Sequence, residues 1–256
     1  MTILDEIATK TKIRVEARKA AVPLKELENK LRIRRGFAFE NALKADGLSF
    51  ICEVKKASPS KGIIAEDFPY IKIAREYEEA GAAAISVLTE PEYFLGSDVY
   101  LAEISKISGI PVLRKDFTVD EYQIYEAASL GASAVLLIAA LLDTDRLKNY
   151  IKIADALGLS SLVETRDEAE IHSALKADAR IIGVNNRNLK TFEVDIRLTA
   201  RLRAFVPDNI IFVAESGIQD YEDIKLLGKV DAVLIGETLM RSSDKKTELI
   251  KLKGSA

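Results

Sequence analysis

The sequence predicts an α/β fold, a single (β/α)8 or TIM barrel preceded by an N-terminal helical extension. Three observations support this prediction: short aliphatic and β-branched runs recur along the chain, amphipathic stretches lie between them, and several of these stretches end in glycine. Alternating strands and helices indicate a parallel sheet, because each parallel strand needs a long crossover connection that a helix can supply. Eight such units can close into a barrel.

The predicted strands begin after an opening segment that is helical in pattern. They span residues 50–54, 83–88, 110–113, 134–138, 161–163, 181–184, 211–213 and 232–235. Between them, stretches such as YIKIAREYEEAG and VDEYQIYEAASLG carry apolar residues at three- and four-residue intervals, which is typical of helices. Gly81, Gly131, Gly158 and Gly228 stand where a helix needs a left-handed terminating residue.

The domain organisation follows from this order of elements. Residues 1–48 precede the first strand, so we expect them to form an extension packed on one end of the barrel. Residues 49–256 then hold the eight β/α units of a single domain, 1–256. The alternative is an open doubly wound sheet, which often has a glycine-rich dinucleotide turn after its first strand. The corresponding turn reads KKASPSKG and lacks the spaced glycines, which favours the barrel.

Charge and hydropathy narrow the class of partner. The net charge of −3 arises from 37 basic and 40 acidic residues mixed along the chain, so no basic block is available for nucleic acid. No apolar stretch approaches the roughly 20 residues of a membrane helix, and the N-terminus is charged where a signal peptide is apolar. We expect a cytoplasmic protein without nucleic acid or membrane as a partner. In solution we expect a monomer or a weak homodimer.

The chain has few of the side chains that commonly bind transition metals. Cys52 is the one cysteine and His172 the one histidine of the chain, and we expect both to be structural. We therefore predict no metal site.

Charged and polar residues gather where the predicted strands end. Glu53 and Lys55 lie two residues apart on the first strand and so point to the same side of the sheet. The active site of such a barrel lies at the C-terminal ends of its strands. Buried charges are costly unless they are paired, so this convergence indicates an ion-pair network or a catalytic site, and the number of strands involved favours the site. The other strand-end residues are Ser86, Lys115, Asp116, Glu164, Asn185, Arg187, Glu215, Ser216, Gly217, Gly236 and Glu237.

The ends of the last two strands indicate a small phosphorylated substrate. The segments AESGI and LIGETL place small residues and glycine where backbone amides can approach a ligand closely. A phosphate site in this part of a barrel is common. Each glycine alone could simply form a tight turn, but the two segments together favour a phosphate.

The segment EVKKASPSKG resembles the signature of the indole-3-glycerol phosphate synthase family, barrel enzymes of tryptophan biosynthesis, with Glu53, Lys55, Ser58 and Pro59 in place. The similarity continues in order through ISVLTEPEYFLGS, PVLRKDF, LGASAVLLI, LVET, IIGVNNRNL, VAESGI and LIGETLM, from about residue 50 to 241, and includes the N-terminal helix. It implies a carboxy-lyase that needs no cofactor. An anilino-deoxyribulose phosphate bearing an aromatic carboxylate cyclises, loses carbon dioxide and water, and becomes indole-3-glycerol phosphate.

The resemblance also implies residue roles. Lys115 would be the general acid that protonates the substrate's ketone oxygen, and Glu164 the general base of the later dehydration. Lys55 would bind the aromatic carboxylate and share in the proton transfer, and Glu53 would orient the lysines and balance their charge. Arg187 would contact the same carboxylate or hold Glu53 and Glu215 in place. Asn185 and Glu215, with Ser86 nearby, match contacts to the sugar and the catalytic groups, and Ser58 and Pro59 match substrate contacts. Phe94 and Phe117 match the walls of the pocket for the aromatic ring. The phosphate contacts would be Ser58, Ser216, Gly217, Gly236 and the backbone amide of Glu237.

Other functions of the same barrel stay open at this point. A Schiff-base aldolase could use Lys115 or Lys55 as its nucleophile. A phosphoribosyl isomerase or a non-catalytic barrel subunit would fit the fold, although EVKKASPSKG and the retained strand-end charges favour neither. The protonation of the lysines is open too, because a neighbouring ammonium lowers a lysine pKa while carboxylates raise it.

Overall fold

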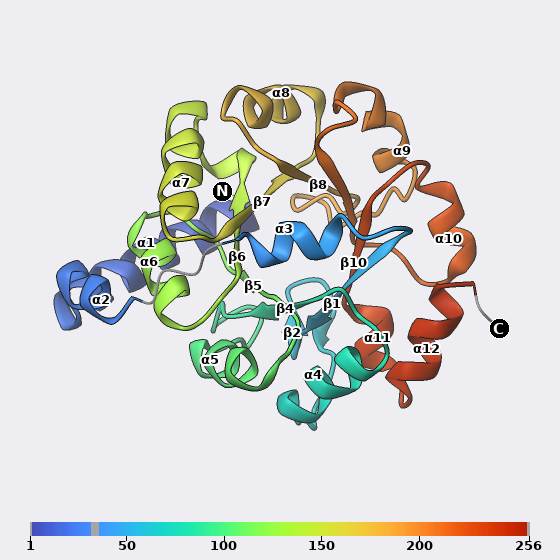
Figure 1. The fold of residues 1–256 in the computed structure, drawn as a ribbon, viewed down its shortest axis with the longest axis horizontal. Coiled ribbons are helices and arrows are strands. Elements are labelled where there is room, and N and C mark those ends of the chain that lie inside the picture. The colour runs from blue at the N-terminus through green and yellow to red at the C-terminus, as the bar shows by residue number, and fades with distance from the viewer. Residues whose placement is uncertain (1, 32–35, 255–256) are drawn as a thin grey trace.

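Eight parallel strands close into a barrel in the computed structural model, which describes residues 2–31 and 36–254 (Figure 1). Residues 1 and 32–35 of the expected extension, and residues 255–256, lie outside the described residues. Each barrel strand pairs with the next along the chain, and β10 pairs with β1, which confirms the predicted (β/α)8 class. The strands are β1 (Ser49–Val54), β4 (Ala84–Leu88), β5 (Val112–Lys115), β6 (Ala134–Ile138), β7 (Ser160–Thr165), β8 (Ile181–Asn185), β9 (Ile211–Glu215) and β10 (Ala232–Ile235).

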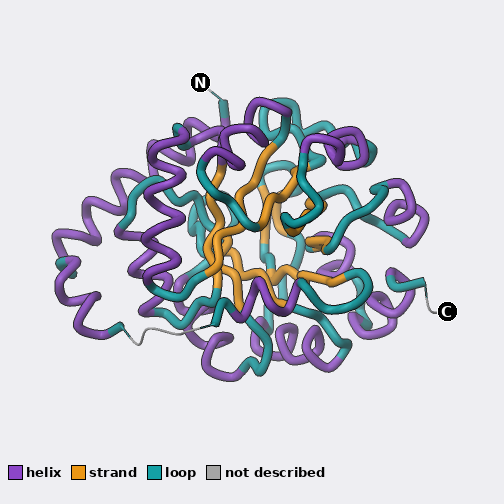
Figure 2. The backbone as a smooth tube through the Cα atoms, turned by 45° about the horizontal axis from the view of Figure 1, so that its top comes forward, coloured by secondary structure: helices purple, strands orange, loops and turns teal. Residues whose placement is uncertain are grey.

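Helices surround the strands as an outer ring (Figure 2). Gly81, Gly131, Gly158 and Gly228 have φ of 79°, 89°, 75° and 73°, so each adopts the left-handed conformation predicted for a helix terminus. The α-helices of the ring are α4 (Tyr70–Glu79), α5 (Asp98–Ile107), α6 (Tyr122–Ser129), α7 (Thr144–Ala156), α8 (Glu168–Lys176), α9 (Leu198–Leu202), α10 (Tyr221–Leu226), α11 (Glu237–Arg241) and α12 (Lys245–Leu252), with short 3-10 turns η1 (Ala139–Leu141) and η2 (Arg203–Phe205).

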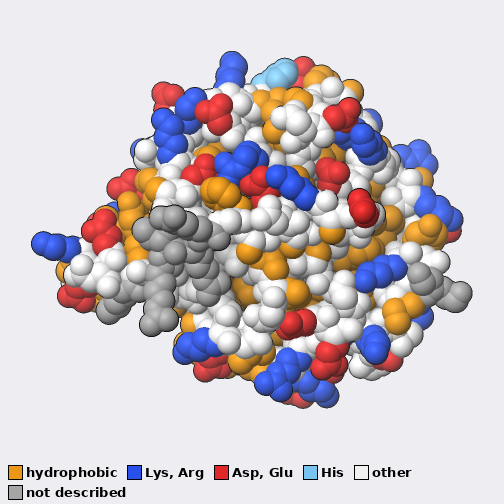
Figure 3. All heavy atoms as spheres, viewed as in Figure 1, with side chains coloured by type: hydrophobic (Ala, Val, Ile, Leu, Met, Phe, Trp, Pro, Cys, Tyr) orange, Lys and Arg blue, Asp and Glu red, His pale blue; other side chains and the backbone are white. Residues whose placement is uncertain are grey.

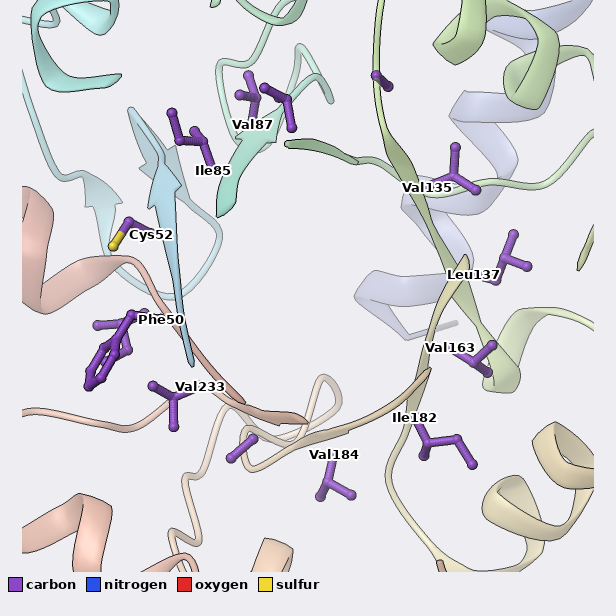
Figure 4. Packing of buried hydrophobic residues seen from close by; sticks show 14 of the residues in the cluster. Phe50, Cys52, Ile85, Val87, Val135, Leu137, Val163, Ile182, Val184 and Val233 are labelled. Carbon is purple, nitrogen blue, oxygen red and sulfur yellow. The ribbon is translucent and has the colours of Figure 1, made fainter. Parts of the chain in front are cut away.

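The main core lies between the strands and this ring. Side chains at alternate strand positions point outward from the barrel toward the helices, among them Cys52, Ile85 and Val163 (Figure 4). The intervening positions point inward and form a second apolar cluster that includes Ile51, Leu113 and Leu162. This alternation explains why the strands read as continuous apolar runs until the polar residues begin at their C-terminal ends.

Strand β5 differs from the prediction, which placed it at 110–113. It begins two residues later because Pro111 has no N–H for the sheet, and it ends in Arg114 and Lys115. The Arg114 side chain is only 2% exposed and pairs with Asp98 (2.9 Å) and Glu126 (2.7 Å). A charge in a buried strand is stable here because its partners come from α5 and α6.

The loop after β1 carries a hairpin that the sequence analysis did not anticipate. It consists of β2 (Ala57–Ser58) and β3 (Gly62–Ile63). The backbone N–H of Ala57 also donates to the carbonyl of Phe94, so this loop is joined to the one after β4.

The N-terminal extension contacts both ends of the barrel rather than the one end expected. Helix α3 (Ala38–Leu43) lies across the N-terminal end, in the middle of Figure 1. The backbone N–H of Glu40 donates to Ser160 Oγ (3.2 Å), and Ser49 Oγ donates to the carbonyl of Ala42 (3.4 Å); Ser160 and Ser49 are the first residues of β7 and β1. Helix α3 is therefore the floor of the barrel.

Helix α1 (Ile3–Ala21) lies at the opposite end of the barrel, beside the C-terminal ends of the strands. It is followed by α2 (Leu24–Lys30). Arg14 reaches Asp116, directly after β5, at 3.7 Å. Arg18 pairs with Asp98 (2.6 Å) and Glu126 (2.7 Å), the same carboxylates that Arg114 contacts. These ion pairs attach α1 to β5, α5 and α6.

Acidic and basic side chains lie interspersed over the face seen in Figure 3, which is the face that carries α3. Across the described residues, no helix is long and apolar enough to cross a membrane.

Removing the Phe39 side chain is expected to weaken the fold without changing the chemistry. Phe39 is fully buried in the inner cluster at the floor, so Phe39→Ala should lower the free energy of unfolding by about 3–5 kcal/mol. Because the floor is remote from the C-terminal ends of the strands, kcat should stay within about twofold at 25 °C. Urea denaturation and steady-state kinetics measure the two effects. A large fall in kcat with unchanged stability would contradict the assignment of Phe39 to the fold alone.

Candidate active site

A cavity of about 770 Å³ opens at the C-terminal ends of the barrel strands. The register of the strands and their two-residue periodicity turn Glu53, Glu164, Asn185 and Glu215 inward at this level. All the predicted site residues except Ser86 contribute to its lining. They are Glu53, Lys55, Ser58, Pro59, Phe94, Lys115, Phe117, Glu164, Asn185, Arg187, Glu215, Ser216, Gly217, Gly236 and Glu237.

Lys115 lies among carboxylates at the base of the cavity. Its Nζ is 3.5 Å from Glu164 Oε2 and 3.5 Å from Glu215 Oε2. Burial alone would lower the pKa of Lys115, but the charges of Glu164, Glu215 and Glu53 outweigh burial and raise it above the ordinary value. The side chain is therefore an ammonium at neutral pH, which settles the balance that the sequence left open.

Glu215 is the most isolated of these carboxylates. Its side chain is 1% exposed, and neither carboxylate oxygen accepts a hydrogen bond from the described residues. Burial raises the pKa of Glu215 to about 8; Lys115 opposes the shift, and the nearby charges of Glu164 and Glu53 add to it. Glu215 therefore exchanges a proton near neutral pH.

The ionisation of Glu215 should make the stability depend on pH. Because its folded pKa of about 8 exceeds its ordinary value of 4.5, the folded chain binds more protons between these values, and stability falls as the pH rises through this window. Glu215→Gln lacks this ionisation. We expect its free energy of unfolding, relative to the unsubstituted chain, to rise by about 1–3 kcal/mol between pH 5 and pH 8. Denaturant titrations at several pH values measure the difference, and a difference that stays constant with pH would contradict the assignment.

Glu53 and Lys55 form the closest ion pair of the cavity, with Lys55 Nζ 2.6 Å from Glu53 Oε2. Burial alone would raise the pKa of Glu53, but the charges of Lys55 and Lys115 outweigh it, and the pKa lies below the ordinary value. Glu53 is therefore a permanent carboxylate that holds Lys55, as expected from their spacing on β1.

Asn185 connects the carboxylate of Glu164 to the loop after β8. Its Nδ2 donates to Glu164 Oε1 (3.2 Å), and its Oδ1 accepts from the backbone N–H of Arg187 (3.0 Å). The side-chain amide is thus fixed in orientation and, in turn, fixes one oxygen of Glu164.

Arg187 contacts Glu237 and the loop after β8 rather than Glu53 or Glu215 among the described residues. Its guanidinium lies 3.8 Å from Glu237 Oε2 and donates to the carbonyl of Phe192 (3.2 Å). Among the described residues it forms no ion pair with either of the other carboxylates. Arg187 lines the cavity, where it can still meet an anionic group of a ligand.

The turns after β9 and β10 present backbone to the cavity. Ser216 and Gly217 both have positive φ, 69° and 84°, and a Cβ on Gly217 would collide with Val194 Cγ1. Strained backbone of this kind clusters at functional sites, and both residues line the cavity. The turn after β10 supplies Gly236.

The carboxylate of Glu237 is held by cations at the cavity rim. It lies 3.3 Å from Lys61 and 3.1 Å from Arg241. Burial alone would raise the pKa of Glu237, but these two partners lower it below the ordinary value. Its backbone amide is thus the group left to face an anion.

An apolar wall forms the remaining side of the cavity. Phe94 and Phe117 lie with ring centroids 6.0 Å apart, at an interplanar angle of 43°. Such a wall suits an aromatic ring, while the ion pairs and glycine turns suit its charged substituents.

A family model described as indole-3-glycerol phosphate synthase matches residues 4–252. The chain belongs to this family. A relative of that name from Ruminiclostridium cellulolyticum is 64% identical over 99% of this chain and 100% of its own. Another, from Endomicrobium trichonymphae, is 55% identical over 98% of this chain and 99% of its own. The resemblance carried by EVKKASPSKG is confirmed.

Solved structures of other enzymes share the barrel. The 3-hexulose-6-phosphate synthase of Salmonella typhimurium aligns with a TM-score of 0.66 and 17% identity, over 81% of this chain and 98% of that chain. The phosphoribosylanthranilate isomerase of Thermotoga maritima aligns with a TM-score of 0.57 and 15% identity, over 81% of this chain and 100% of that chain. At these identities the likeness shows the fold alone.

The cavity is also lined by residues that the sequence analysis missed. Ile3, Leu4 and Ile7 of α1 line the cavity next to the aromatic wall. Their one-, three- and four-residue spacing marks an apolar helix face, but it does not say which end of the barrel that face covers.

Ser86 is the one predicted site residue that does not line the cavity. It is fully buried beside Glu53 in the sheet register, and its Oγ has no hydrogen-bond partner among the described residues. Cys52 and His172 are also absent from the lining, and burial raises the pKa of the Cys52 thiol to about 12. Within the ranges 2–31 and 36–254, no cluster of three or more His, Cys, Asp or Glu side chains is arranged to hold a metal.

Proposed function

We propose that this chain converts 1-(2-carboxyphenylamino)-1-deoxyribulose 5-phosphate to indole-3-glycerol phosphate, the reaction implied by its family. The observation that carries the proposal is the buried ammonium of Lys115, placed between Glu164 and Glu215 at the base of a cavity with one apolar and one glycine-rich side. The substrate has a matching distribution of groups: an aromatic ring, a carboxylate, a ketone and a phosphate.

Binding would align the two ends of the substrate with the two sides of the cavity. The aromatic ring would lie against Phe94 and Phe117, with its carboxylate on Lys55 and Arg187. The phosphate would lie at the opposite side. It would be bound by Ser58, by the amides of Ser216, Gly217, Gly236 and Glu237, and by Pro59 as a wall of the same loop.

Ring closure requires charge stabilisation at the ketone. As the ring carbon that bears the carboxylate attacks the ketone carbon, negative charge develops on the ketone oxygen, and Lys115 would donate a proton to it. Loss of carbon dioxide then restores the aromatic ring. In the dehydration that follows, the hydroxyl formed from the ketone would leave as water with a proton from Lys55, and Glu164 would accept the proton lost by the adjacent carbon, with Asn185 fixing its orientation. Asn185 and Glu215 would meanwhile meet the sugar hydroxyls.

The protonation state of Lys115 favours this reaction over a Schiff-base aldolase. A Schiff base forms from a neutral amine, whereas the surrounding carboxylates raise the pKa of Lys115 and keep it charged. Borohydride added with a keto-sugar phosphate should therefore leave no adduct on Lys115. A trapped adduct would favour the aldolase.

The direct test is to mix the purified protein with the carboxyphenylamino-deoxyribulose phosphate, without added metal, and follow indole fluorescence. We expect fluorescence to appear with turnover. A folded protein that binds the substrate but yields no fluorescence would overturn the proposal. The cytoplasmic location, the absence of nucleic-acid partners and the monomer or weak homodimer stay predictions, and sedimentation velocity tests the last.

A further inference from the structure

We infer that Gly183 is a positioning residue: the missing side chain at this point of β8 makes the space in which the carboxylate of Glu215 lies beside Lys115. The inference rests on the proposed function, because it concerns how a residue of that site is held. Gly183 itself is not part of the cavity lining.

The geometry of the two neighbouring strands places Gly183 against Glu215. In the sheet register Gly183 pairs with Val213 and Asn185 with Glu215, so the Glu215 side chain returns over β8 inside the barrel. A Cβ built on Gly183 would collide with Glu215 Oε1 and would lie 3.3 Å from Glu215 Cδ and 3.2 Å from Leu162 Cδ1. The carboxylate thus occupies the volume that any other residue would fill.

The backbone offers no other reason for glycine at this position. Gly183 lies inside a strand and does not have a positive φ, so a residue with a side chain could adopt the same conformation. Glycine weakens a strand interior and commonly marks a place where another group approaches closely. Here the group that approaches is the Glu215 carboxylate.

No described residue holds Glu215 through a hydrogen bond to either carboxylate oxygen. Its position is set by the walls around it and by the 3.5 Å approach of Lys115 Nζ. A methyl group on Gly183 would therefore drive the carboxylate out of its site and change the distance to Lys115.

A related arrangement occurs directly after β10 and supports this interpretation. A Cβ on Gly236 would collide with Glu53 Oε2 and lie 2.8 Å from Lys55 Nζ. Glu215 and Glu53 thus each lie against a glycine, Gly183 on β8 and Gly236 directly after β10. Gly236 belongs to the proposed phosphate side, however, so Gly183 gives the cleaner test.

The experiment is a double-mutant cycle with Gly183→Ala and Glu215→Ala. We expect Gly183→Ala alone to lower kcat about 10- to 100-fold, since displacements of about 1 Å in an active site have effects of this size. In the Glu215→Ala background, where no carboxylate is left to displace, Gly183→Ala should change kcat less than twofold. If the same factor is lost in both backgrounds, or if Gly183→Ala alone retains full kcat, the inference is overturned.

A matched control is available at Gly109, where a Cβ would lie 2.6 Å from Glu78 Oε1, before β5 and away from the cavity. Gly109→Ala should leave kcat unchanged. If Gly183→Ala fails to fold, the double variant decides: recovery of the fold on adding Glu215→Ala supports the inference, and failure to recover it shows that the clash lies with β7 or the backbone and overturns the inference.

A second readout does not depend on turnover. Carboxylate NMR of the unsubstituted chain and of Gly183→Ala reports the titration of Glu215, which should move by at least half a pH unit when the carboxylate is displaced. An unchanged titration would contradict the inference. If the chain failed to produce indole-3-glycerol phosphate, the proposed function would fall while this readout could still support the role of Gly183.

Discussion

Lys115→Ala is expected to reduce kcat/KM by at least about 10³-fold, because the variant loses both the proton donor and the charge that stabilises the ketone oxygen. Lys115 is the ammonium that the described structure places beside both Glu164 and Glu215. The fold should survive, since Glu215, whose pKa burial raises to about 8, can take up a proton once the ammonium is gone. Indole fluorescence measures turnover, and circular dichroism verifies the fold.

Lys115→Met is the control for lost packing in this experiment. It keeps most of the length of the side chain and removes only the charge, so it should be as inactive as Lys115→Ala. Near-normal turnover in either purified variant would show that another group supplies the proton.

Glu164→Gln should lower kcat by about 10²–10⁴-fold with a much smaller change in KM. Glutamine has the same shape as glutamate, and its oxygen can still accept the hydrogen bond from Asn185, so the cavity should keep its form. What it loses is the capacity to accept a proton as water leaves. Steady-state kinetics separate the two parameters.

Asn185→Ala is the companion variant for Glu164→Gln. If Glu164 acts as a base, releasing its orienting partner should also lower kcat, by a smaller factor. A Glu164→Gln variant with a raised KM and an unchanged kcat would instead place Glu164 in substrate binding.

The barrel could be predicted because its pattern is local. Each strand carries a short apolar run and each helix its own three- and four-residue periodicity, so neither depends on distant partners. The site followed from topology: parallel strands end on the same side, and hence Glu53, Glu164 and Glu215 had to meet once the barrel closed.

The errors arose where distant residues decide the structure. The predicted strand stopped before Arg114 and Lys115 because they are charged, and the partners that stabilise the buried Arg114 include Asp98 and Glu126 on other elements. The role of Arg187 was open for the same reason, since Glu237 as its partner lies in another β/α unit. Packing between distant segments also determined that the extension covers both barrel ends.

The floor formed by α3 has a consequence for the order of folding. Its inner cluster joins Phe39 and Leu43 to residues of many strands, including Ala232 and Leu234 of β10, and β1 completes its pairing only with β10. On a growing polypeptide, α3 is synthesised before every strand that it covers. It therefore has no complete surface to dock on until the last strand has left the ribosome. Helix α3 thus finishes folding late, because its contacts have a large sequence separation. Its apolar side chains stay exposed until the barrel is complete.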